Sequence, residues 1–167
     1  MNVLTRPLRP GWHETNKPAA SIKTDEFEQY VRAVHFPRDS YDLLLKINDI
    51  GAGADNFFPG VKPPDFKYVS KKDGFEFFVE AKFRSRFQDQ ITEWAKLFEA
   101  RRYQELNPAT PEFIAIGVGG RPAAPERVYL VPARDLKFVT QYPSVMQKYE
   151  LYPGRAVDEK LLRRILE

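Results

Sequence analysis

Two acidic residues and a lysine, Asp65, Glu80 and Lys82, could together support phosphodiester hydrolysis. Asp65 follows Pro64, and Ala81 separates Glu80 from Lys82 in an alternating, strand-like run. In a strand Glu80 and Lys82 would share one face, about 6.5–7 Å apart. Neighbouring carboxylates repel each other unless a cation lies between them, and oxygen ligands suit Mg²⁺ or Mn²⁺. A lysine beside such a metal can position or deprotonate a water molecule, or stabilise charge on a phosphoryl oxygen.

A β-hairpin is the element that would bring these residues together. Strand-like runs at 65–70 and 75–84 lie on either side of a charged segment that ends in Asp73-Gly74. Asp-Gly between two such runs is a strong signal for a tight hairpin turn. In the second run every other residue is apolar, which predicts one buried face and one face with the charged side chains.

The register of that hairpin decides which side chains meet. A two-residue turn would pair Lys67 with Glu80 and Asp65 with Lys82. Residues opposite each other share a face of a sheet, so Asp65, Glu80 and Lys82 are predicted to converge. A slip of one residue would turn one strand over and separate them. The register is therefore the structural test of this metal-site prediction.

The remaining elements predict an α/β fold in which helices flank a mixed central β-sheet. In chain order we expect a helix that begins near Thr24 and ends at Pro37, an apolar run at 41–47 that could be strand or helix, the hairpin, a helix at 87–106, strands at 113–118 and 127–131, and a helix at 158–166. Residues 1–20 contain several prolines and no periodicity, which predicts an N-terminal arm followed by a single domain at 21–167.

Composition excludes several classes of site. The chain has 167 residues, of which 43% are hydrophobic, so it can form a core of ordinary size. It has no cysteine and two histidines, which rules out disulfide scaffolds, iron–sulfur clusters and thiol nucleophiles and makes a histidine-rich metal site hard to build. No apolar run is long enough to span a membrane, and no signal-peptide pattern is present, so we expect no membrane partner and a cytoplasmic location.

Pro64-Asp65 followed by Glu80-Ala81-Lys82 on a hairpin strand resembles the PD-(D/E)XK nucleases, the restriction-endonuclease-like superfamily. Acid-x-Lys triplets occur four times in the chain, so the specificity comes from the preceding Pro-Asp and from the hairpin. The resemblance covers roughly residues 24–132 and implies a restriction-endonuclease-like core. It also implies that Asp65, Glu80 and the carbonyl of Ala81 bind Mg²⁺ or Mn²⁺, while Lys82 assists the attacking water.

The resemblance further implies a glutamate on the first helix, which Glu28 would supply, and a glutamine after the motif, which Gln88 or Gln90 would supply. Residues 62–86 carry a net charge of +3, which suits a polyphosphate backbone, although a solvated hairpin tip would have the same composition. These considerations give the candidate nucleic-acid contacts Lys67, Arg84, Arg86, Gln88 and Gln90. Arg102 is added because it falls on the otherwise apolar face of the predicted helix at 87–106, where it could reach a phosphate or extend its charged end to solvent.

Three functions are compatible with this sequence. The first is a metal-dependent endonuclease that acts on a nucleic acid, DNA being favoured. The second is a nucleic-acid-binding or assembly module that has the same fold without turnover, and the third is an interaction protein whose charged hairpin has no chemical role. A homodimer is a further expectation, because one site cuts one strand and two-fold dimers are the commonest oligomers.

Overall fold

The computed structural model describes residues 19–46, 61–86, 92–93, 97–136, 140–141 and 143–167. Its helices are α1 (Ala19–Tyr30), which continues into a π-helix at Val31–His35, α2 (Leu97–Leu106), α3 (Pro143–Met146) and α4 (Glu159–Arg164), with 3₁₀ turns at Ala133–Asp135 and Gln147–Tyr149. Its strands are β1 (Tyr41–Lys46), β2 (Phe66–Ser70), β3 (Glu76–Arg84), β4 (Thr92–Glu93), β5 (Glu112–Arg121), β6 (Ala124–Pro132) and β7 (Thr140–Gln141).

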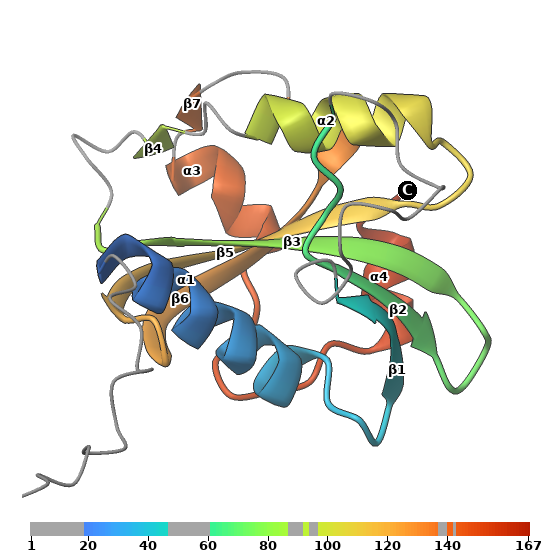
Figure 1. Ribbon diagram of the computed structural model, residues 1–167, viewed down its shortest axis with the longest axis horizontal. Helices are drawn as coiled ribbons and strands as arrows, with labels where there is room; N and C mark the ends of the chain where they lie inside the picture. Colours follow the sequence, from blue (N-terminus) through green and yellow to red (C-terminus); the bar gives the residue numbers. More distant parts are fainter. Residues whose placement is uncertain (1–18, 47–60, 87–91, 94–96, 137–139, 142) are drawn as a thin grey trace, which may run out of the picture.

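Five strands form one mixed sheet in the order β1-β2-β3-β5-β6. β3 and β5 run parallel, and the other neighbouring pairs run antiparallel. Parallel strands need a long crossover connection, and the chain between β3 and β5 carries α2. Figure 1 shows α1 crossing one face of the sheet and α2 lying over the other, which confirms the predicted fold class.

Alternating residues of the central strands fill two cores. We call the two sides of the sheet the α1 face and the α2 face. The α1 face packs Phe27 against odd-numbered residues of β3 and β5, such as Phe77. On the α2 face, Phe78 meets Tyr103 of α2 with ring centroids 5.4 Å apart. Even-numbered residues of β3 therefore lie on the α2 face, and the predicted alternation of that strand is observed.

Gly117 of β5 lets α1 approach the sheet closely. A β-carbon added at Gly117 would lie 2.4 Å from Cε2 of the Phe27 ring, which is far inside van der Waals contact. Phe27 is fully buried and immediately precedes the candidate residue Glu28. The glycine therefore sets how near Glu28 comes to the sheet.

We expect Gly117→Ala to lower the free energy of unfolding by about 1–3 kcal/mol, because the new methyl group overpacks the core. Chemical denaturation monitored by circular dichroism measures the loss. As a control, Gly117→Ala should cost less in a Phe27→Leu background than in the wild type, since the smaller side chain removes the clash. Equal losses in the two backgrounds would contradict this explanation.

The first helix begins earlier than the sequence predicts. α1 starts at Ala19, so Thr24 lies inside the helix rather than capping it. Alanine is the strongest helix former, and Ala19-Ala20 extend the helix by more than one turn beyond the predicted start. The first two residues of α1 thus belong to the segment predicted as an arm, whose other residues lie outside the described part of the chain.

The segment after the hairpin also differs from the prediction. The prediction of one helix over 87–106 is wrong in its first half, because Thr92–Glu93 forms strand β4, which pairs with β7. Helix α2 begins only at Leu97 and ends at Leu106, as predicted. Strand pairing with a distant segment overrides the local helical pattern here. The run at 41–47, which the sequence leaves open, forms strand β1. The predicted last helix is confirmed as α4, and Asp158 caps it by accepting a hydrogen bond from the Leu161 amide at 2.7 Å.

Candidate active site

The hairpin between β2 and β3 has a four-residue loop instead of the predicted two-residue turn. Ser70 donates its amide hydrogen to the Phe75 carbonyl at 2.9 Å, which closes the loop over residues 71–74. Gly74 ends the loop with a φ of +70°. A two-residue type I′ turn needs left-handed backbone at two successive residues, which would include Asp73. The longer loop leaves this conformation to the glycine.

The register consequently differs by two residues from the prediction. Lys67 lies opposite Phe78, not opposite Glu80, and the same register places Asp65 level with Glu80 instead of Lys82. Because side chains alternate with a period of two, this shift changes the partners and leaves every side chain on its predicted face. The predicted pairings are wrong, and the predicted sharing of one face is observed.

Asp65 and Glu80 are joined directly, just beyond the end of the β2–β3 ladder. The Asp65 amide donates to Oε2 of Glu80 at 3.1 Å, and the Ala81 amide donates to Oδ2 of Asp65 at 2.9 Å. Both side chains are buried, with 6% and 8% of their surface exposed. These reciprocal bonds hold two carboxyl groups side by side in a protected position. We call Asp65 and Glu80 the carboxylate pair.

Two lysines supply positive charge to the carboxylate pair. The Lys82 ammonium forms an ion pair with Oε1 of Glu80. Lys62 Nζ lies 3.6 Å from Oδ1 of Asp65 and also 3.6 Å from Oε1 of Glu80. Lys62 therefore occupies the position of a bridging cation. The sequence shows it only as one of several basic residues near the hairpin, although its placement three residues before Asp65 is a usable signal.

The electrostatics of the carboxylate pair favour an additional cation. Burial raises the pKa of Asp65, the Glu80 carboxylate raises it further, and the Ala81 amide and the two ammonium groups only partly oppose this. Burial opposes charge on Lys62 as well, but the two carboxylates outweigh it and raise its pKa. Asp65 and Glu80 place carboxylate oxygens around the position of the Lys62 ammonium. Oxygen donors in this arrangement fit Mg²⁺ or Mn²⁺. In the described residues no group of three or more Asp, Glu or His side chains gathers closely enough to hold a metal, so such an ion would keep water ligands.

The fold that carries the carboxylate pair is similar to that of a solved structure. The structure is similar to that of Hjc, a Holliday junction resolvase from the hyperthermophilic archaeon Archaeoglobus fulgidus, with a TM-score of 0.50 and 12% sequence identity. The similarity covers 74% of this chain and 92% of the Hjc chain. The chain has the restriction-endonuclease-like fold. No family model and no curated protein sequence matches it.

Within this restriction-endonuclease-like fold, Glu28 reaches the same region from α1. It is 5% exposed, and burial raises its pKa, while Lys46 opposes the rise and Asp25 and Glu80 add to it. The charge of Glu80 is thus felt at Glu28. Among the described contacts it shares no hydrogen bond with the carboxylate pair, so the structure brings Glu28 near this pair without making it a member.

The candidate nucleic-acid contacts are spread over several places. Lys67 is engaged within the hairpin, because its Nζ lies 2.6 Å from Oε2 of Glu76 and 5.7 Å from the centre of the Phe78 ring. Arg84, at the end of β3, donates to the Phe83 carbonyl at 2.9 Å. Two of the others are exposed, Arg86 after β3 and Arg102 on α2, and two lie outside the described residues, Gln88 and Gln90.

Glu112 is a buried acid that the sequence analysis did not single out. It is the first residue of β5 and lies opposite Phe78 of β3. Two residues further along, Ile114 lies opposite Glu80, so Glu112 and Glu80 are on the same face of the sheet, the α2 face. It is 1% exposed, and neither carboxyl oxygen has a hydrogen-bond partner among the described residues. Burial raises its pKa to about 9, with further contributions from Glu80 and Asp65. The only sequence signal was an acid directly before a buried apolar strand.

Glu112 should make stability fall as the pH rises. Its pKa is about 9 in the folded chain and 4.5 for a glutamate in water, so between these values the folded state holds a proton that the unfolded state releases. Glutamine cannot titrate. We expect Glu112→Gln to raise the free energy of unfolding by about 4 kcal/mol relative to the wild type near pH 8 and to have little effect near pH 5.

Denaturant titrations in EDTA at several pH values measure this difference. The matched control is Glu105→Gln, an exposed glutamate paired with Arg101 on α2, which should shift both ends of the pH range equally. A Glu112→Gln variant whose stability follows the wild-type pH profile would show that Glu112 is ionised in the folded protein.

Proposed function

We propose that this protein is a divalent-metal-dependent nuclease that hydrolyses phosphodiester bonds, with DNA as its substrate. The observation that carries the proposal is the buried carboxylate pair, joined by two reciprocal hydrogen bonds and flanked by Lys82. The similarity to Hjc, a Holliday junction resolvase, supports a nuclease on the same fold. No described helix is both long and apolar enough to cross a membrane.

The residues of this chain divide the chemistry between them. Asp65 and Glu80 would hold Mg²⁺ or Mn²⁺, and the Ala81 carbonyl is proposed as a further ligand. When bound, such a metal acts as a Lewis acid toward a phosphoryl oxygen. Glu80 fixes the Lys82 ammonium beside the pair, where it can orient a water molecule and stabilise negative charge on the phosphate. Glu28 adds a further carboxylate from helix α1.

Cleavage assays test the proposal. Labelled DNA duplexes, four-way DNA junctions, single strands and an RNA strand of matching sequence are incubated with Mg²⁺ or Mn²⁺, with EDTA as the control. We expect DNA to be cut only with metal. Acidification from about pH 8 to pH 6 should weaken cleavage, because the raised pKa of Asp65 favours its protonated form, which holds a metal poorly. Binding of DNA without cleavage under all conditions would favour the catalytically silent module.

A homodimer is part of the proposal. One chain carries one carboxylate pair, and one such site cuts one strand, so a double-strand cut needs two copies or two successive nicks. Light scattering at micromolar protein, with and without DNA, measures the mass. A monomer under both conditions would limit the enzyme to nicking.

A further inference from the structure

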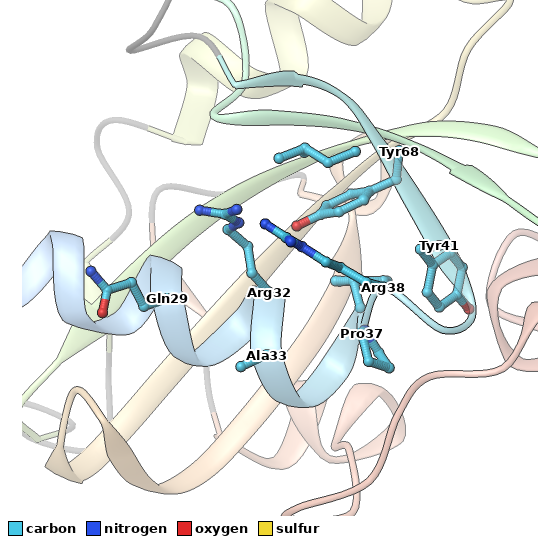
Figure 2. Close-up of a pocket in the computed structure, with 9 residues that line it drawn as sticks. Gln29, Arg32, Ala33, Pro37, Arg38, Tyr41 and Tyr68 are labelled. Carbon is cyan, nitrogen blue, oxygen red and sulfur yellow. The ribbon is translucent and has the colours of Figure 1, made fainter.

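A separate pocket on the α1 face is lined by several groups that could bind an anion. It lies between the end of α1, the turn that follows and strands β1 and β2, and has a volume of about 350 Å³. Figure 2 shows two guanidinium groups, those of Arg32 and Arg38, extending toward the hydroxyl of Tyr68. Gln29 lines the same pocket one turn earlier on α1. We call this the arginine pocket.

The Tyr68 hydroxyl is an unused donor at the bottom of the arginine pocket. Tyr68 is 2% exposed, and its hydroxyl has no hydrogen-bond partner among the described residues. Tyr41, which also lines the pocket, differs because its hydroxyl donates to the Val157 carbonyl. Burial raises the pKa of Tyr68, although Arg32 opposes the rise, so the group stays a neutral O–H donor. A buried hydroxyl without a partner is costly, which points to a ligand that accepts its hydrogen.

The positive charge of the two arginines is not neutralised within the described residues. Within the part of the chain that the structure describes, neither guanidinium forms an ion pair with a carboxylate. Arg32 lies on the π-helix at Val31–His35, and its guanidinium carbon is 6.0 Å from the centre of the Phe66 ring. Arg38 lies in the turn after Pro37, and the Lys71 ammonium donates to its carbonyl. Two charged groups are thus presented to the pocket on a fixed backbone.

The chemistry of these groups selects a phosphate. The two guanidinium groups and the tyrosine hydroxyl all offer hydrogens to one small volume, and guanidinium groups match phosphate oxygens in a bidentate geometry. The rest of the lining is largely apolar and aromatic, as in Phe36 and Leu43, which suits the base or sugar attached to such a phosphate.

The position of the arginine pocket relates it to the carboxylate pair. Arg32 follows Glu28 by four residues along α1 and the π-helix that continues it, which is about one helical turn. Glu28 in turn lies within the electrostatic reach of Glu80. The arginine pocket thus lies about one helical turn from Glu28 but on the opposite face of the sheet from Asp65 and Glu80, so a phosphate held there is a contact separate from the carboxylate pair.

We propose that the arginine pocket binds a backbone phosphate of the nucleic-acid strand on which the protein acts. The identification of the ligand as a nucleic-acid strand rests on the proposed nuclease function, whereas the phosphate binding itself is measured without cleavage. A free nucleotide has the same phosphate chemistry, so the experiment includes both sources.

Binding is measured on the full chain in EDTA, where no cleavage occurs. The probes are a fluorescein-labelled 12-nucleotide DNA single strand without terminal phosphates and thymidine 3′,5′-bisphosphate. We expect Arg32→Gln and Arg38→Gln each to weaken strand binding about tenfold. Each should also lower the slope of log K against log salt by about 0.7. Tyr68→Phe, which keeps the ring and its packing, should weaken binding about threefold.

The matched control is Arg127→Gln. Arg127 is 58% exposed on β6, the opposite edge strand of the sheet from β1, and its variant should bind both probes as the wild type does. Circular dichroism shows that each variant is folded. Loss of binding for the strand alone identifies a nucleic-acid contact, and an equal loss for thymidine bisphosphate identifies a nucleotide site; both results support the pocket.

Two outcomes would overturn the inference: a wild type that binds neither probe, or pocket variants that bind both probes with wild-type affinity and salt dependence. The nuclease proposal fails independently of this. If DNA binding depends on the two arginines but DNA is not cut in Mg²⁺, the nuclease proposal is refuted and the pocket is supported. If DNA is cut in Mg²⁺ but the pocket variants bind like the wild type, the pocket is refuted and the nuclease proposal is supported.

Discussion

Glu80→Gln is expected to reduce metal-dependent cleavage by about a thousandfold. Glutamine has nearly the same volume, so the buried position stays filled, but the charge that would hold a cation and that pairs with Lys82 is removed. Its amide can still accept the hydrogen bond from Asp65. Single-turnover cleavage of a labelled DNA in Mg²⁺ measures the rate, and circular dichroism shows whether the fold is retained.

Glu76→Gln is the matched control for this substitution. Glu76 lies on the same strand and the same face, four residues before Glu80, and pairs with Lys67 on the exposed part of the hairpin. We expect cleavage within a few-fold of the wild type. If Glu80→Gln cut DNA as fast as the wild type, the cleavage would belong to another site or to a contaminating enzyme.

Lys82→Met should slow cleavage by about a hundredfold and leave metal binding in place. Methionine keeps most of the length and apolar character of the side chain but removes the ammonium that Glu80 fixes beside the site. Because a positive charge leaves the neighbourhood of the carboxylate pair, Mn²⁺ should bind at least as tightly as to the wild type. Single-turnover rates and calorimetric Mn²⁺ titrations separate the two effects.

Lys160→Met provides a control with the same sequence pattern in a different structure. Lys160 ends an acid-x-Lys triplet that starts at Asp158, but this triplet lies at the beginning of helix α4, and its lysine is exposed. Its substitution should alter neither the rate nor Mn²⁺ binding. A Lys82→Met variant that cleaves normally would show that Lys82 has a structural role only.

The sequence alone predicts the elements that depend on strand periodicity. The alternation over 75–84 correctly places Glu80 and Lys82 on one face, and the apolar run at 113–118 is confirmed as part of a buried central strand. The approach of Asp65 to Glu80 is observed although the turn was predicted wrongly. This prediction tolerated the error because the loop differs by an even number of residues, which preserves the faces of both strands.

Features that depend on distant segments could not be predicted in this way. Strand β4 forms because it pairs with β7, nearly fifty residues later. Glu112 is recognisable as a buried acid only when β5 lies beside β3. The arginine pocket combines a helix, a turn and a strand, and each of its polar residues taken alone is an ordinary surface or core residue. Such sites are defined by tertiary contacts that no local pattern encodes.

The two ammonium groups beside the carboxylate pair bear on how folding relates to metal availability. Lys62 and Lys82 compensate the negative charge of Asp65 and Glu80 within the chain itself. In small zinc domains the metal supplies the free energy of folding, and chelators unfold the protein. Here the buried acids have counter-ions within the chain, so we expect the chain to stay folded when a chelator removes metal. Under the proposed function, metal supply would then govern the activity of the protein and not its folding.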